Sequence, residues 1–235
     1  MGANHGLAQV GARAYSTNTL ESGWIPSPLP AVYSGEEMKP YREWLTEDSY
    51  EASGSIGGSF VSENVEDYYL TPHALGYSFY VKFDHDFIGR EELEKVDKDA
   101  QRHKVTFEWN PDDVTRVWNS MFNPHGENFK YLDMPQANYT SATYDNVTRN
   151  GKHVGFSMFS GYTFNDRAFV SLGVVDPDIK VGDELTLIWG EENGGTAKTT
   201  VERHRQTEIR VRVAPTPYSR DARQNYASGW RTRSQ

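Results

Sequence analysis

The first periodic stretch of the chain covers residues 11–22 and predicts a helix. Positions three or four residues apart carry Ala12, Tyr15 and Thr19, which therefore fall on one helical stripe. Gly23 and a run of prolines follow at once, and both residue types end helices. Each proline also biases the residue before it away from helical backbone, so we expect extended or turn structure after the helix.

The middle of the chain alternates between short elements and polar connections. Apolar and polar positions alternate over residues 76–83, which predicts a strand, and residues 87–96 predict a short helix. The polar run 97–102 then indicates a connection, and we place a domain boundary there. The earlier glycine-rich patch at 54–58 lacks the Lys-Ser/Thr pair of a phosphate-binding loop, so we expect an ordinary loop.

The pattern of the remaining chain is that of a β protein. Short strand-like runs recur at close spacing, separated by glycine and proline turns, which is typical of a barrel or a sandwich. A short helix is expected near residues 112–121, followed by a loop to residue 150, and the Asn-Gly-Gly sequence at 193–195 is a hairpin signal. The predicted fold class is therefore α+β, with strands expected at 104–109, 152–159, 168–175, 184–190, 196–202 and 207–214.

Composition and length place the protein among ordinary globular chains. Its 235 residues suit one or two domains, and a hydrophobic content of 37% is sufficient for a core. The chain has no cysteine, which excludes disulfides and thiolate chemistry and favours a reducing compartment. No signal peptide is evident, and no apolar run reaches the ~18 residues of a membrane span. We therefore expect a cytoplasmic protein, in which the glycosylation sequons at Asn138 and Asn146 are chance matches.

The charge balance argues against two classes of partner. A net charge of −9 disfavours nucleic acid and anionic membranes as main partners. The charge is uneven, because residues 202–233 contain eight arginines against three acids. This basic stretch is interpreted either as a solvated strand face and tail or as a local anion site.

Common catalytic motifs are missing from the sequence. The seven histidines form neither H-x-H nor H-E-x-x-H, so a metal site is not expected. No G-x-S-x-G supports a serine nucleophile, and no G-x-G-x-x-G follows a strand. Motifs and composition alone therefore do not identify a reaction that this protein catalyses.

Three segments, in order along the chain, resemble the aminomethyltransferase family, whose members include the glycine-cleavage T-protein. Residues 11–13 (GAR) and 20–23 (LESG) are similar to the family's G-A-R and L-E-x-G. Residues 75–93 contain its K…F-I-G-R-E-x-L pattern as Lys82 and FIGREEL. Residues 151–185 and the PTPY at 215–218 resemble its C-terminal barrel and closing P-T-N-Y.

Within that family the resemblance is greatest to the tetrahydrofolate-dependent O-demethylases of vanillate and syringate. The wording of residues 13–30, of YEASG at 50–54 and of WGEENGG at 189–195 is typical of those proteins. The resemblance implies methyl transfer from a methoxylated aromatic acid to tetrahydrofolate. The alternatives are an aminomethyltransferase of glycine cleavage or related one-carbon metabolism, and a non-catalytic folate-binding or assembly module.

The resemblance implies a catalytic role for Tyr15. With residues 20–23 as the anchor, Tyr15 replaces an Arg that contacts substrate in aminomethyltransferases; with residues 11–13 as the anchor, that Arg is retained as Arg13. The first alignment fits the chemistry better, because a tyrosine of ordinary pKa about 10 can deliver a proton to a departing phenolate. Without the resemblance, Tyr15 would be interpreted as a core aromatic.

Four further residues receive roles from the resemblance. Trp24 is predicted to be a flat wall for the pterin or the arene, and Glu21 to reach the pterin amines. Arg13 and Tyr218 are predicted substrate contacts. Arg13 is expected to form a bidentate pair with the substrate carboxylate or with the folate tail. The structural alternatives are a core position for Trp24, a purely structural role for Glu21 and a surface ion pair for Arg13. Next to Tyr218, Pro217 stands where the family carries Asn, which departs from the family pattern.

The resemblance covers only the later part of the family's fold. We expect residues 1–96 to be the C-terminal portion of a split folate-binding domain, residues 97–218 a T-protein-like barrel, and residues 219–235 a basic tail. The family's earlier half supplies most of the pterin pocket, so this chain is expected to need that half, or a partner chain carrying it, to complete the site.

Overall fold

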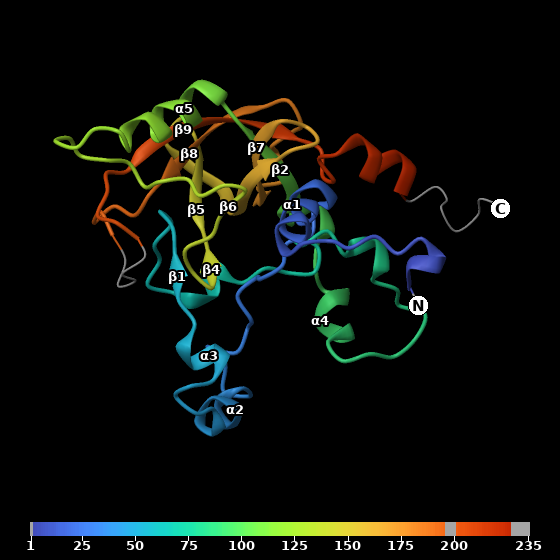
Figure 1. Cartoon of the computed structure of the whole chain (residues 1–235). Helices are drawn as coiled ribbons and strands as arrows, with labels where there is room; N and C mark the ends of the chain where they lie inside the picture. Colours follow the sequence, from blue (N-terminus) through green and yellow to red (C-terminus); the bar gives the residue numbers. More distant parts are fainter. Residues whose placement is uncertain (1, 196–200, 227–235) are drawn as a thin grey trace.

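The computed structural model describes residues 2–195 and 201–226 of the chain. Figure 1 shows a barrel of strands with short helices and loops of the first hundred residues arranged beside it. That first region contains η1 (Gly2–His5), α1 (Ala12–Ser22), α2 (Lys39–Trp44), α3 (Tyr50–Ser53), β1 (Ile56–Gly57), η2 (Val65–Tyr68), η3 (Ser78–Tyr80), α4 (Arg90–Glu94) and η4 (Lys98–Ala100).

The remaining described residues supply most of the strands. In chain order the elements are β2 (His103–Trp109), α5 (Pro111–Ser120), β3 (Gln136–Ala137), β4 (Ala142–Thr143), β5 (Asp145–Arg149), β6 (Lys152–Thr163), β7 (Ala168–Val175), β8 (Glu184–Trp189), β9 (Thr207–Ala214) and η5 (Ala222–Tyr226). The described part contains no helix long and apolar enough to cross a membrane.

Six of these strands form a closed antiparallel barrel. They are hydrogen-bonded in the order β6-β5-β8-β9-β2-β7, and β7 pairs back with β6, which closes the ring. Closure satisfies backbone groups that an open sheet would leave at its edges. The mixture of helix and sheet and the barrel predicted for the later part of the chain are therefore confirmed.

The barrel is filled by one face of its strands. On β9, Ile209, Val211 and Val213 are buried in the core, while the charged residues that alternate with them are exposed, as the period of two requires. Two tryptophans, Trp109 and Trp189, meet inside with ring centroids 5.3 Å apart. The indole N–H of Trp109 donates to the Ser171 hydroxyl at 2.9 Å, so its polar atom is satisfied despite burial.

A second core lies on the outside of the barrel. Val170, Leu172 and Val174 of β7 pack there with Leu20 of α1 and with Tyr68. Strand β7 is therefore buried on both faces, which explains its nearly continuous apolar sequence. This second core joins α1 and its neighbours to the barrel wall.

The strand predicted at 76–83 is wrong. Gly76 has a left-handed backbone (φ 80°), and the amide of Tyr77 bonds back to the Pro72 carbonyl at 2.8 Å. These turns lead into η3, whose Phe79 and Tyr80 are about three-quarters exposed (76% and 74%). Alternation in this segment therefore does not mark a half-buried strand. The helix expected at 87–96 is shorter, covering Arg90–Glu94.

The loop predicted up to residue 150 is also wrong in part, because it contains β3, β4 and β5. Strand β5 has the polar sequence DNVTR and therefore lacks the apolar alternation that predicts a strand. The strand predicted at 196–202 lies mostly outside the described residues, as does most of the basic tail. The second strand of the expected hairpin thus lies mostly outside the described residues. Strand β8 pairs with β9, and in the connection between them the Gly194 amide closes a turn by donating to the Glu191 carbonyl at 3.0 Å.

Candidate functional site

Helix α1 carries most of the residues predicted for the site. It starts after Gly11 and ends at Gly23, whose left-handed backbone (φ 73°) lets its amide bond back to the Thr19 carbonyl. Leu20 is fully buried and anchors the helix on the outer core. The opposite face of α1 therefore remains open to solvent.

Tyr15 and Trp24 lie together on this open face. Their rings meet edge to face, with centroids 6.4 Å apart and planes at 77°. The side chains remain exposed, Tyr15 by 60% and Trp24 by 42%, which answers the alternative of two core aromatics. An edge-to-face pair left exposed offers a flat indole surface and a phenol hydroxyl to a ligand. The catalytic role of Tyr15 and the wall role of Trp24 stay predictions that this geometry permits.

Glu21 faces the turn that follows β6 on the barrel. Its carboxylate accepts hydrogen bonds from the Thr163 hydroxyl at 2.6 Å and from the Asn165 amide at 3.0 Å to each oxygen. These bonds hold α1 to the barrel, which favours the structural role that the sequence left open for Glu21. Its contact with the pterin amines stays a prediction.

The segment that contains Tyr218 lies beside the C-terminal end of α1. The amide of Ser219 donates to the Glu21 carbonyl at 3.2 Å, so this segment lies against the end of the helix. The Tyr218 hydroxyl donates to Glu108 of β2 at 3.0 Å. Burial and the neighbouring Glu108 carboxylate raise the pKa of Tyr218 well above its usual range, so this phenol stays protonated.

Arg13 occupies the exposed first turn of α1. Its guanidinium makes no hydrogen bond or ion pair with any residue that the structure describes. This geometry gives no support to the surface ion pair considered as the alternative. The structure thus brings Tyr15 to Trp24, and Glu21 to the Tyr218 segment, whereas the substrate contact of Arg13 stays a prediction.

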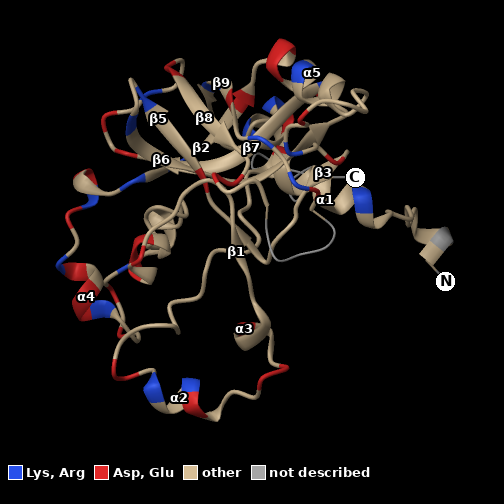
Figure 2. Ribbon diagram, turned by 90° about the vertical axis from the view of Figure 1, so that its left-hand side faces the viewer, with Lys and Arg blue, Asp and Glu red and all other residues tan. Residues whose placement is uncertain are grey.

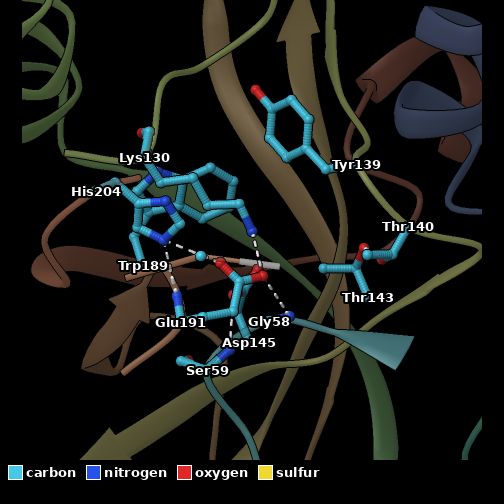
Figure 3. A network of polar contacts seen from close by, with 12 residues as sticks. Gly58, Ser59, Lys130, Tyr139, Thr140, Thr143, Asp145, Trp189, Glu191 and His204 are labelled. Carbon is cyan, nitrogen blue, oxygen red and sulfur yellow. Dashed lines mark hydrogen bonds and ion pairs between the residues drawn. The ribbon is translucent and has the colours of Figure 1, made fainter. Parts of the chain in front are cut away.

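A buried cluster of charged side chains, which no sequence pattern predicted, lies against the barrel (Figure 3). Lys130 is only 1% exposed, and its ammonium donates to Glu191 at 2.8 Å. The Lys130 ammonium also lies over the rings of Tyr139 and Trp189, at 5.2 Å and 5.0 Å from their centroids. This strongly buried ion pair lies among aromatic side chains of the barrel core.

Two further titratable side chains complete the cluster. His204 Nε2 lies 3.0 Å from the Glu191 carboxylate and accepts the Glu191 backbone amide at 3.1 Å. His204 Nδ1 lies 2.8 Å from the Glu202 carbonyl. Burial alone would raise the pKa of Glu191, but His204 and Lys130 hold it well below its usual range. Burial raises the pKa of Asp145 to about 7, against the attraction of Lys130.

The cluster holds the glycine-rich segment of the first region against the barrel. The Gly58 amide donates to Glu191 at 3.0 Å, and the Ser59 amide donates to Asp145 at 3.2 Å (Figure 3). The glycine-rich patch is therefore neither a phosphate loop nor free. The only sequence feature that includes Glu191 is the WGEENGG motif at 189–195, which resembles the O-demethylases. No sequence pattern connects Glu191 with Lys130 or Asp145.

Charged side chains elsewhere are distributed over the surface. Figure 2 shows acidic and basic residues interspersed along the barrel strands and on α4, which stands away from the barrel in both views. Within the described ranges, no group of three or more His, Asp or Glu side chains could hold a metal ion.

The fold and site define a class: a closed antiparallel barrel against which a helix presents an exposed pair of aromatic side chains. No protein family model matches the chain. Syringate O-demethylase from Sphingobium sp. (strain NBRC 103272 / SYK-6) is 52% identical over 233 residues, covering 99% of this chain and 50% of that protein. Sesamin methylene transferase from Sinomonas sp. (strain No.22) is 30% identical over 231 residues, covering 91% of this chain and 48% of that protein.

The chain thus spans about half the length of the curated relatives it matches. The similarity extends over nearly all of this chain, including α1 and the barrel. It supports the resemblance to O-demethylases that the sequence motifs indicated.

Proposed function

We propose that this chain forms part of a tetrahydrofolate-dependent O-demethylase, which transfers a methyl group from a methoxylated aromatic acid such as vanillate or syringate. The observation that carries the proposal is the exposed aromatic pair formed by Tyr15 of α1 and Trp24 just after it, in a chain that is 52% identical to a syringate O-demethylase. Both named relatives act as one-carbon transfer or demethylation enzymes by their names, which supports the reaction class.

The exposed aromatic pair fits a flat cofactor. An uncovered indole can stack on a pterin or an arene, and the adjacent phenol can donate a hydrogen bond. Tetrahydrofolate, when bound, supplies the nitrogen that accepts the methyl group. In this proposal Tyr15 donates its phenolic proton to the oxygen that loses the methyl group, and Trp24 orients the aromatic groups and keeps water from them.

The proposal includes a partner for this chain. The relatives are about twice as long as the region that matches, so we propose that a region equivalent to their remainder covers the open face of α1. In this arrangement residues 1–96 and 97–218 act as the end of the folate-binding domain and its barrel. Arg13 then binds the substrate carboxylate, for which a guanidinium without a partner among the described residues is suited.

The test is to combine this chain with the remaining region of the syringate O-demethylase relative and follow the formation of both 5-methyltetrahydrofolate and methylenetetrahydrofolate, the product that an aminomethyl donor gives. Vanillate, syringate and an aminomethyl donor are supplied separately. We expect product from at least one methoxybenzoate and none from the aminomethyl donor. Turnover of the aminomethyl donor alone would replace the proposal with an aminomethyltransferase.

A binding measurement separates catalysis from simple folate binding. The isolated chain is titrated with tetrahydrofolate while tryptophan fluorescence is followed, because Trp24 lies on the proposed surface. We expect little binding compared with the combined protein. Equal affinity would instead indicate a stand-alone folate-binding module.

A further inference from the structure

A second concave site lies between β1, β4 and the proline-rich segment that follows Trp24. The cavity measures about 170 Å³. Its walls are mostly apolar, and they come from segments far apart in the sequence. The principal wall residues are Leu29, Tyr33, Tyr50, Ile56, Val65 and Ala142. None of the lining residues belongs to α1 or to the Tyr218 segment, so this cavity is distinct from the site on α1.

The walls of the cavity are held in place before any ligand arrives. Strands β1 and β4 pair in parallel, and the Ala142 amide donates to the Ser55 carbonyl at 3.0 Å. The Tyr33 hydroxyl donates to the Glu51 carbonyl at 3.0 Å, which fixes the ring on the opposite wall. Just beyond β1, Gly58 is bonded to the buried Glu191. Fixed walls lower the ordering cost of binding.

The lining contains hydroxyl groups but no charged side chain. Three serines contribute, at positions 27, 55 and 141. The Ser55 hydroxyl accepts the Ser141 amide at 3.3 Å, whereas the Ser141 hydroxyl makes no hydrogen bond within the described part of the chain. The half-buried Ser141 hydroxyl is therefore available to a ligand in a mostly apolar site.

We propose that this cavity binds a neutral aromatic ring carrying an oxygen substituent, the class to which methoxyphenols belong. A cavity of about 150 Å³ in another protein holds benzene, so this space suits a single ring. Tyr33, Tyr50 and Ile56 supply apolar contact, and the Ser141 hydroxyl bonds to the oxygen substituent. A carboxylate on the ring would lose its hydration without gaining a cation, so the site selects against aromatic acids.

This site is independent of the proposed methyl transfer, and it is tested without tetrahydrofolate. Guaiacol and vanillate share a methoxyphenol ring and differ in the carboxylate, so they are the two probes. Each is titrated calorimetrically into the whole chain. We expect guaiacol to bind at least about tenfold more tightly than vanillate.

Substitutions locate the binding. Ile56→Trp fills the cavity from its edge and is expected to abolish guaiacol binding, whereas Val61→Trp, at a 77% exposed position outside the cavity, retains it. Ser141→Ala removes only the hydroxyl and weakens guaiacol binding about fivefold, which keeps the test valid if the larger substitution prevents folding. Trp24→Ala changes the site on α1 and leaves guaiacol binding unchanged.

Three outcomes overturn the proposal. The first is that guaiacol does not bind the unmodified chain. The second is that vanillate binds as tightly as guaiacol, which contradicts selection by charge. The third is that binding survives both Ile56→Trp and Ser141→Ala, or is lost in Trp24→Ala, which places the ligand elsewhere. Loss of O-demethylation in the combined protein has no bearing on these results.

Discussion

Gly23 ends α1 directly against Thr216, so closely that a Cβ built on the glycine would lie 2.4 Å from Cγ2 of the threonine. The backbone of Gly23 is also left-handed, with φ 73°. Two separate constraints therefore require glycine at this position: the turn that ends the helix, and the approach of the segment that carries Tyr218.

We expect Gly23→Ala to lower the free energy of unfolding by about 2–5 kcal/mol, the sum of a left-handed alanine and an overpacked contact. Gly35→Ala is the matched control, because Gly35 has φ 79° but nothing within 4 Å of the added carbon. That control should lose only about 1–2 kcal/mol. Urea unfolding measures both, and equal losses would show that the contact with Thr216 does not matter.

The buried ion pair predicts a large effect of removing one partner. Lys130→Met leaves Glu191 charged in a dry site and is expected to cost about 3–5 kcal/mol of unfolding free energy. Lys95→Met is the control, since Lys95 pairs with Glu92 on the surface, with both side chains mostly exposed. It should cost at most about 1 kcal/mol. A small loss for Lys130→Met would mean that water enters the cluster.

Asp145 gives this protein a pH dependence of unusual sign for a carboxyl group. Its pKa of about 7 in the folded protein exceeds the ~3.9 of an unfolded chain, so the folded state holds the proton more tightly. Its contribution is fully present below about pH 4 and is lost as the pH rises through about 7. The groups that face it are Lys130, Glu191 and His204.

The difference in unfolding free energy between the native protein and Asp145→Asn isolates this contribution. Relative to Asp145→Asn, the native protein should lose up to about 1.4 kcal/mol of unfolding free energy for each pH unit between pH 4 and 7. Above pH 7 the difference should no longer change with pH. Burial lowers the pKa of His103 and His153, which acts in the opposite direction in both proteins and cancels in the difference. A difference that does not vary with pH would contradict the raised pKa.

In the combined enzyme, Tyr15→Phe should lower kcat by about 10²–10⁴-fold, because the leaving oxygen loses its proton donor. Tyr80→Phe is a control at a 74% exposed tyrosine of η3 and should leave kcat unchanged. The measurement is the rate of 5-methyltetrahydrofolate formation from syringate or vanillate. An unchanged rate in Tyr15→Phe would show that the tyrosine does not deliver the proton in this reaction.

The sequence predicted elements whose signal is local. Helix α1 and strands β2 and β7 could be located because their caps and apolar runs lie within the element itself. Strand β5 could not, since its buried Asp145 and Thr148 are satisfied by partners far along the chain. The opposite error occurred at η3, where alternating aromatic and polar residues predicted a strand although the segment pairs with no strand in the described part of the chain.

The same distinction applies to the sites. The segment with Tyr15 and Trp24 could be selected by its resemblance to O-demethylases, and the structure adds that the two rings touch. The ion pair of Lys130 with Glu191 could not be predicted, because 61 residues separate the partners and only barrel closure brings them together. The cavity beside β1 also depends on segments that no sequence pattern connects.

The outer core of β7 has a consequence for how the chain can be divided. Leu20 and Tyr68, from the first predicted domain, are buried against side chains that belong to the barrel of the second. A protease that cut the chain near residue 97 would therefore yield two pieces that remain associated. Separated by denaturant, the first piece would lack the barrel wall against which Leu20 and Tyr68 are buried, and the barrel would refold with that wall uncovered and prone to aggregation.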